Sequence, residues 1–186
     1  GDPKWKGRLC LRTSGYIYNQ SLLATMIKRH GEARTEDIAK SWADNQPVLI
    51  NSDSKILEAI AAGQCDVGVT NHYYLARIVA RDPTFPVLPF WANQQTTGTH
   101  VNVSGAGVTA HAKNRASALK FLEFLSSAEA QQMFADLAFE YPANSQAAIN
   151  PLVAKWGKFK QDDINIASAG EFQAAATRLA DRAGYR

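Results

Sequence analysis

Short apolar segments alternate with helix-like segments over the first 81 residues, and this alternation constrains the fold more than any other feature. The apolar runs at residues 8–13, 47–50 and 65–70 stay largely apolar from one position to the next instead of alternating with polar residues. Strands of this kind are buried on both faces, which is typical of a parallel sheet covered by helices. We therefore expect an α/β fold in which the sheet is mostly parallel.

Helix boundaries follow from local signals in the same region. Helical spacing of apolar residues predicts helices at 18–30, 36–43 and 71–81, and another after Asn51-Ser52. Gly31 is expected to end the first of these helices and Thr35 to cap the second. Beyond residue 85 we expect a crossing segment at 85–90, a turn and strand at 104–108, and helices at 115–125, 128–139 and 170–183.

Composition excludes several function classes. The chain has 186 residues, of which 46% are hydrophobic and 20% charged, with a formal net charge of +3. This is the composition of an ordinary globular protein large enough to bury a core. Basic residues do not cluster with aromatic ones, so we expect no nucleic-acid partner. Apolar runs are too short for a membrane span, so we expect no direct membrane insertion.

Cys10 and Cys65 both lie in predicted strands. If the strands are neighbours, about 4.8 Å apart, the two thiols can meet. A disulfide would indicate an oxidising compartment. Buried free cysteines are also common, and two free thiols are our expectation here.

Polar residues collect where the predicted strands end, at Thr13-Ser14, Asn51-Ser52 and Asn71-His72-Tyr73-Tyr74. In open parallel sheets, ligands bind at this edge. The unperturbed pKa of a tyrosine is about 10, so Tyr73 and Tyr74 would ionise at neutral pH only beside a highly charged cation. Adjacent tyrosines also commonly pack their rings and hydrogen-bond through their hydroxyls. The residues alone leave both interpretations open.

Taken together, the motifs resemble the periplasmic iron(III)-binding proteins of ABC importers, the ferric-binding or bacterial transferrin type. They occur in the family's order over the whole chain, and the tyrosine pair is the most specific of them. The matching segments are residues 5–8, 13–15, 17–20, 51–52, 60–63, 71–74, 103–108, 118–125 and 140–142, with Asp66.

The resemblance implies a type II periplasmic-binding-protein-like α/β fold, with one complete lobe and part of a second. Tyr18, Tyr73 and Tyr74 match the positions of Fe³⁺ ligands. Thr13, Ser14 and Asn71 match positions that hold a synergistic anion, carbonate or phosphate, in some members. Tyr16 stands where such members carry a small residue, and the segment around Asn51 differs in length, so the anion stays open.

The resemblance also implies a domain division and partners. Residues 1–92 correspond to the second lobe, 93–149 to a returning part of the first lobe, and 150–186 to C-terminal helices that pack back on the second lobe. The expected partners are an ABC-transporter permease in the inner membrane and the missing N-terminal part of the same protein. The implied location is the periplasm.

Other ligands and other protein classes are the alternatives. A related binding protein for a polyamine, thiamine or a phosphonate would use aromatic residues as stacking walls and carboxylates for a cationic ligand. Carboxylates are scarce at the predicted site, which argues against an amine. A hydrolase using Ser104 or His72 lacks the flanking Gly-x-Ser-x-Gly pattern and a catalytic partner. A regulator's effector domain would be joined to a DNA-reading helix-turn-helix, which nothing here resembles. We expect a binding protein and no enzyme.

Overall fold

The computed structural model describes all residues, Gly1–Arg186, and divides into two compact units. Unit 1 comprises Gly1–Leu75, Thr84–Asn102 and Phe159–Arg186, and unit 2 comprises Ala76–Pro83 and Val103–Lys158. In chain order the elements are η1 (Pro3–Trp5), β1 (Leu9–Leu11), α1 (Ile17–His30), α2 (Glu32–Asp44), β2 (Val48–Leu49), α3 (Asp53–Ala61), β3 (Val67–Gly68), α4 (His72–Arg81), α5 (Arg115–Leu125), α6 (Ala128–Met133), η2 (Phe134–Ala138), α7 (Pro151–Ala154), η3 (Ile166–Ser168) and α8 (Ala169–Arg182).

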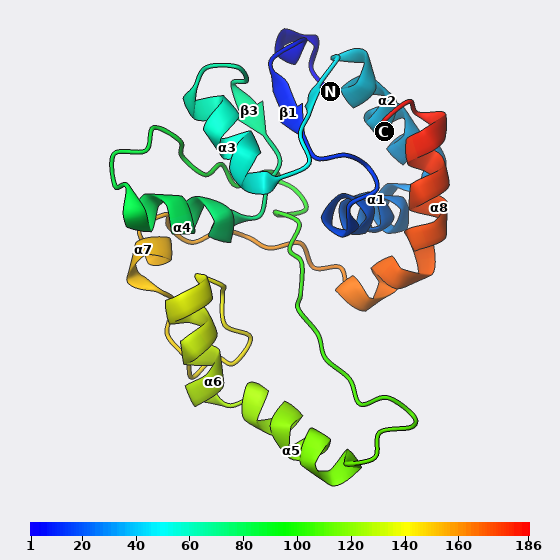
Figure 1. Cartoon of the computed structure of the whole chain (residues 1–186). Helices are drawn as coiled ribbons and strands as arrows, with labels where there is room; N and C mark the ends of the chain where they lie inside the picture. Colours follow the sequence, from blue (N-terminus) through cyan, green and yellow to red (C-terminus); the bar gives the residue numbers. More distant parts are fainter. The chain divides into compact units, whose positions relative to one another are not determined.

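A three-stranded parallel sheet forms the centre of unit 1, in the order β2-β1-β3 (Figure 1). Cys10 of β1 is in register with Val48 on one side and with Gly68 on the other. All three residues of β1 are buried, as expected for a central strand covered on both faces. The parallel sheet predicted from the apolar runs is therefore confirmed.

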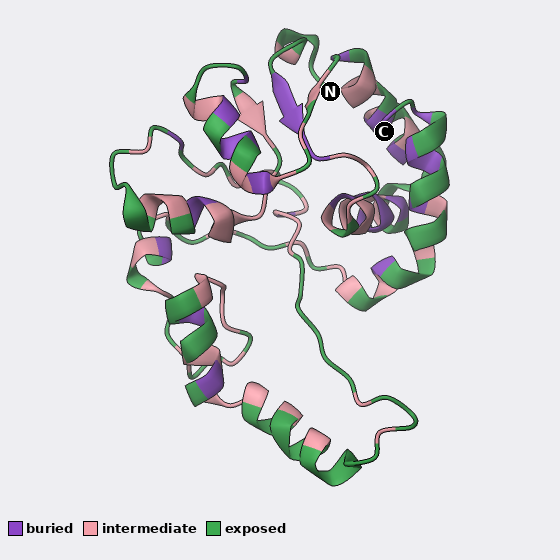
Figure 2. Ribbon diagram, in the orientation of Figure 1, coloured by how far each residue is buried: buried purple, intermediate pink, exposed green.

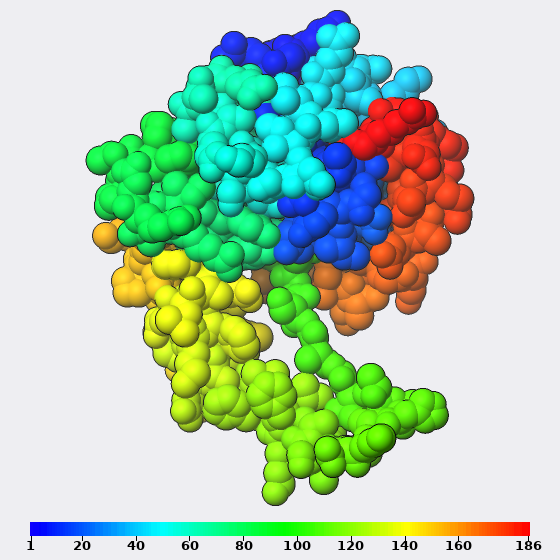
Figure 3. Space-filling model, viewed as in Figure 1, coloured from blue at the N-terminus to red at the C-terminus, as the bar shows by residue number.

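Helices α1, α2 and α8 cover one face of this sheet. Figure 3 shows α8, in red and orange, lying against α1, in blue. Leu23 of α1 and Leu179 of α8 are fully buried in this core, together with Tyr185 beyond α8. Gly31 separates α1 from α2 with φ = 79°, a left-handed value that glycine adopts without strain. The expected end of α1 at Gly31 is confirmed.

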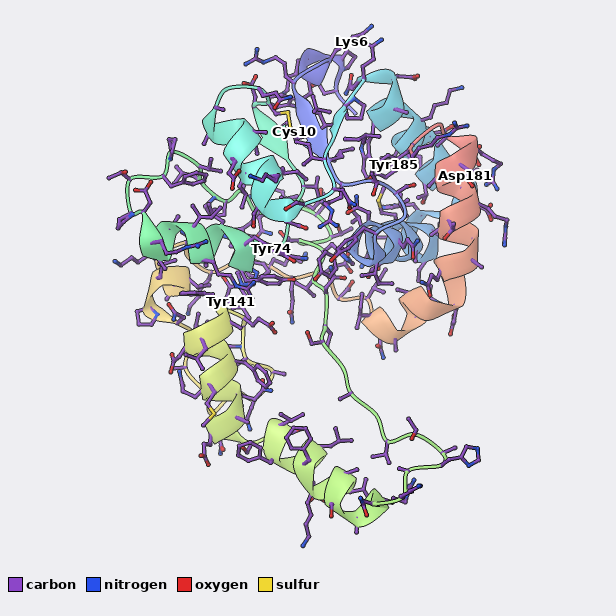
Figure 4. All side chains as sticks on the ribbon, viewed as in Figure 1. Lys6, Cys10, Tyr74, Tyr141, Asp181 and Tyr185 are labelled. Carbon is purple, nitrogen blue, oxygen red and sulfur yellow. A yellow bond between two sulfur atoms is a disulfide. The ribbon has the colours of Figure 1, made fainter.

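A disulfide joins Cys10 to Cys65 on the other side of β1, where both residues pack with Ile56 of α3. Figure 4 shows the bond in yellow beside the label of Cys10. The Cα atoms are 5.8 Å apart. The expectation of two free thiols is thus wrong: Cys65 lies just before β3, the strand next to β1, and this position brings its sulfur to that of Cys10.

Three local expectations are also wrong. Thr35 lies inside α2, where its hydroxyl donates to the carbonyl of Gly31, and Gly31 itself occupies the capping position. The helix expected at 128–139 ends as α6 at Met133 and continues as a π-helical turn, η2. Residues 104–108 form no strand, because a strand needs a hydrogen-bonded neighbour and the described chain offers none there.

Unit 2 buries little of its apolar surface. No residue of α5 is buried, and this helix is mostly green and pink in Figure 2. Phe121 is 59% exposed and Leu137 80% exposed. No helix of the chain is both long enough and apolar enough to cross a bilayer. The lobe boundaries expected near residues 92 and 149 stay a prediction.

Candidate metal centre

The predicted site residues of unit 1 stand where its strands end and its helices begin. β1 leads into Arg12, Thr13 and Ser14, and α1 begins at Ile17, next to Tyr18. The segment after β3 leads to Asn71, and α4 then begins at His72. Tyr73 and Tyr74 therefore lie in the first turn of α4, and Figure 4 shows Tyr74 there. Burial of the strands fixes these ends, so the sheet positions the polar residues that follow.

The phenols of Tyr18, Tyr73 and Tyr74 come together in this region. The hydroxyl of Tyr73 donates to the hydroxyl of Tyr18, 2.9 Å away, although the two residues are 55 positions apart. The rings of Tyr73 and Tyr74 are tilted by 38° with centroids 4.6 Å apart. The tyrosines therefore pack their rings and hydrogen-bond through their hydroxyls, and the same contacts gather three phenol oxygens in one place.

The surroundings favour the protonated form of Tyr73 and Tyr74 in the absence of a cation, because they raise the pKa of both. Burial, followed by the hydrogen bond with Tyr18, raises the pKa of Tyr73 far above its ordinary value. Burial and a hydrogen bond with Tyr18 also raise the pKa of Tyr74, to about 12. Each phenol disfavours ionisation of its neighbours because like charges repel. A cation placed among the three oxygens reverses this balance, since it favours the phenolate form.

Asn71 connects the cluster to two further segments. Its side-chain Nδ2 donates to the hydroxyl oxygen of Tyr73 at 3.3 Å, and its backbone N–H donates to Asp53 Oδ1 at 3.4 Å. Its Oδ1 accepts from Asn102 Nδ2 at 3.4 Å. The hydrogen bonds that join the phenols do not include Thr13 or Ser14, which follow β1. Of the three predicted anion-binding residues, the structure links only Asn71 to the tyrosines.

A buried ion pair between Arg12 and Asp53 lies beside the cluster and was missed by our sequence reasoning. Arg12 Nη2 also donates to Asn51 Oδ1 at 3.1 Å, and its guanidinium carbon lies 3.4 Å from the centroid of the Tyr16 ring. Two sequence features could have indicated this ion pair: an arginine at the end of an apolar strand and an aspartate directly after Asn51-Ser52. Asp53 is a carboxylate beside the cluster, and its charge is already paired with Arg12.

Aromatic side chains surround the tyrosines on the side of His72. The ring centroids of His72 and Tyr73 are 5.7 Å apart, and those of His72 and Trp91 are 6.4 Å apart. Trp91 in turn stacks on Phe159 at 4.4 Å. Oxygen atoms of phenols and amides thus lie beside a group of aromatic side chains. No group of three or more His, Cys, Asp or Glu side chains is placed to hold a metal. Hard oxygen donors of this kind suit a hard, highly charged cation.

Residues 1–168 match the family described as bacterial extracellular solute-binding protein. The chain belongs to this family. Within the family, the whole chain is 39% identical to iron uptake protein A1 of Synechocystis and spans 53% of that protein.

Solved solute-binding proteins share the fold. A Trichodesmium protein, IdiA (FutA), solved with iron and citrate, superposes on 98% of this chain with a TM-score of 0.92 and 40% identity. The ferric binding protein of Campylobacter jejuni superposes on 98% of the chain with a TM-score of 0.93 and 28% identity. The type II periplasmic-binding-protein fold is thereby confirmed. In both cases the chain covers 60% of the relative, so it spans little more than half the length of the proteins it matches.

Proposed function

We propose that this chain binds ferric iron through the phenolate oxygens of Tyr18, Tyr73 and Tyr74, as part of a binding protein that delivers iron to an ABC importer. The observation that carries the proposal is the 2.9 Å contact between the hydroxyls of Tyr73 and Tyr18, with Tyr74 packed against Tyr73. Residues far apart in sequence bring hard oxygen atoms to one place. The names of the relatives, iron uptake protein and ferric binding protein, agree with this chemistry.

Fe³⁺ is the substrate in this proposal, and each phenol that binds it loses a proton. The raised pKa values of Tyr73 and Tyr74 mean that these two phenols give up their protons only when a strongly charged cation binds. We further propose that Thr13, Ser14 and Asn71 hold a small oxyanion, carbonate or phosphate, that completes the coordination of the ion. Asn71 supports this role because it already touches Tyr73.

The partners are a permease in the inner membrane and an N-terminal part equivalent to the portion of the relatives outside the match. The exposed apolar residues of unit 2, such as Phe121 and Leu137, support the second partner because large apolar patches mark interaction surfaces. The Cys10–Cys65 disulfide supports a periplasmic location, where disulfides persist.

The test is the addition of ferric citrate to the chain, alone and together with an N-terminal part taken from a relative. Binding should produce a visible phenolate-to-iron charge-transfer band, and Tyr73→Phe should remove most of it. Trp42→Phe is the control for an aromatic substitution elsewhere in unit 1, since Trp42 packs against the core formed by α1, α2 and α8. A band that survives Tyr73→Phe unchanged would show that Tyr73 is not a ligand.

A further inference from the structure

We propose that Arg12 is the positioning residue of the tyrosine cluster: its guanidinium holds the start of α1, which carries Tyr18, and the start of α4, which carries Tyr73, in one fixed arrangement. The inference rests on the proposed iron site and extends it to Arg12, which is not one of the three proposed ligands.

One arm of Arg12 reaches the segment of Tyr73 through Asp53. Arg12 Nη1 donates to Asp53 Oδ2, and the other carboxylate oxygen, Oδ1, accepts from the backbone N–H of Asn71. Asn71 in turn donates to the hydroxyl of Tyr73. A planar guanidinium orients a carboxylate in a way that a lysine ammonium cannot. The position of Asn71, and with it that of Tyr73, therefore depends on the orientation of Asp53.

The other arm of Arg12 reaches the segment of Tyr18 through stacking. The guanidinium carbon lies 3.4 Å from the centroid of the Tyr16 ring, and the Tyr16 and Tyr18 rings meet edge to face with centroids 4.8 Å apart. Tyr16 precedes α1 directly and makes no side-chain capping bond to it. Stacking on Arg12 is what holds this ring against Tyr18.

The backbone of Arg12 is itself held firmly. Its carbonyl oxygen accepts from Tyr185 Oη at 2.6 Å and from Asn19 Nδ2 at 3.2 Å. All three residues are buried. A side chain that extends from such an anchored backbone has little freedom, so it can fix the groups it touches.

Stability alone does not account for this arrangement. Buried ion pairs often contribute little net stability, because desolvation offsets the attraction. Arg12 Nε is moreover buried without a hydrogen-bond partner, which is unfavourable. Burial of the Arg12 guanidinium is costly in this way, yet the group faces both segments of the proposed site. We therefore explain its burial by the positioning of Tyr18 and Tyr73.

The decisive variant is Arg12→Lys, which keeps the charge and loses the fork and the stacking surface. In the iron-free chain, we expect native-state hydrogen exchange at the Asn71 amide to become faster than the change in global stability explains. In the iron-loaded protein, we expect a shifted charge-transfer band and iron dissociation about 10- to 100-fold faster. Leu179→Ala, a core substitution on α8, is the control for general destabilisation.

The outcomes distinguish a failure of the proposed iron site from a failure of the proposed role of Arg12. If the unchanged protein shows no charge-transfer band with its N-terminal part present, the proposed function fails, while exchange at Asn71 still tests the role of Arg12. The inference is overturned if Arg12→Lys leaves hydrogen exchange at Asn71, the charge-transfer band and the iron dissociation rate unchanged. It is also overturned if Leu179→Ala shifts the band as much as Arg12→Lys does. Tyr16→Leu, which spares the ion pair, tests the stacking arm if Arg12→Lys does not fold; unchanged iron dissociation would then overturn the inference.

Discussion

A disulfide joins Cys10, in the central strand β1, to Cys65, in the segment that leads into the neighbouring strand β3. β1 continues to Arg12 and β3 continues toward Asn71, so the disulfide ties together the two strands that end at the tyrosine cluster. Cys10 is the middle residue of β1 and Cys65 precedes β3, whereas the phenols lie beyond the ends of both strands.

Removal of this disulfide should destabilise the chain markedly. It closes a loop with a sequence separation of 55 residues, and the loss of loop-closure entropy predicts a decrease in the free energy of unfolding of about 4 kcal/mol for Cys10→Ala/Cys65→Ala. Urea unfolding of the oxidised protein and the variant measures the difference. Dithiothreitol should destabilise the oxidised protein and leave the variant unaffected; equal effects on both would contradict the assignment.

Leu179→Ala should lower the free energy of unfolding by about 2–5 kcal/mol. Leu179 is fully buried between α8 and α1, so truncation leaves a cavity in the core of unit 1. Leu137→Ala is the matched control, because the same change at an 80% exposed position should alter stability by about 0.5 kcal/mol or less. Urea unfolding compares the two, and similar losses would argue against the described core.

Alkaline pH should weaken the fold through Tyr185. Burial raises the pKa of this residue to about 12, and a hydrogen bond from Asn19 partly opposes the rise. The unfolded chain has the ordinary pKa of about 10, so above this pH the unfolded state loses its proton first. The stabilising contribution, about 2–3 kcal/mol, is present below pH 10 and disappears as the pH approaches 12.

Unfolding midpoints in urea across this range measure the effect, with Tyr185→Phe as the comparison. The variant lacks the ionisable group, so its stability should fall less steeply between about pH 10 and 12. Parallel curves would show that Tyr185 does not cause the loss.

Acid should release iron from the proposed site. Protons compete with the metal for phenolate oxygens, so occupancy should fall with decreasing pH more steeply than one proton per ion. The charge-transfer absorbance, followed during acidification in the presence of citrate, measures this. The Tyr18→Phe protein should take up fewer protons when it releases iron, so its absorbance should fall less steeply with pH. Iron occupancy that does not depend on pH would rule out phenolate coordination.

The apolar residues of unit 2 should bind a hydrophobic dye. Phe121 and Leu137 are largely exposed, so Phe121→Ser/Leu137→Ser should reduce the fluorescence of bound anilinonaphthalene sulfonate without lowering stability. Addition of the N-terminal part of a relative should reduce the signal of the unchanged chain in the same way. A signal that neither change affects would place the dye elsewhere.

Local patterns predicted the sheet and the tyrosines but not the ion pair. Continuous apolar runs identified β1, β2 and β3 because burial on both faces leaves that signature in the sequence. The role of Arg12 depends on residues from three separate segments, and no spacing pattern in the sequence predicts such contacts. The expected strand at 104–108 failed for a related reason, since pairing depends on a neighbour and not on the residues alone.

The hydrogen bond from Tyr185 to the carbonyl of Arg12 joins residues 173 positions apart. A chain that is synthesised from its N-terminus presents Tyr18, Tyr73 and Tyr74 long before Tyr185 follows. The arrangement around Arg12 is therefore complete only after Tyr185 has docked on it. On the proposed role of Arg12, a nascent chain should capture metal poorly until α8 has packed against α1.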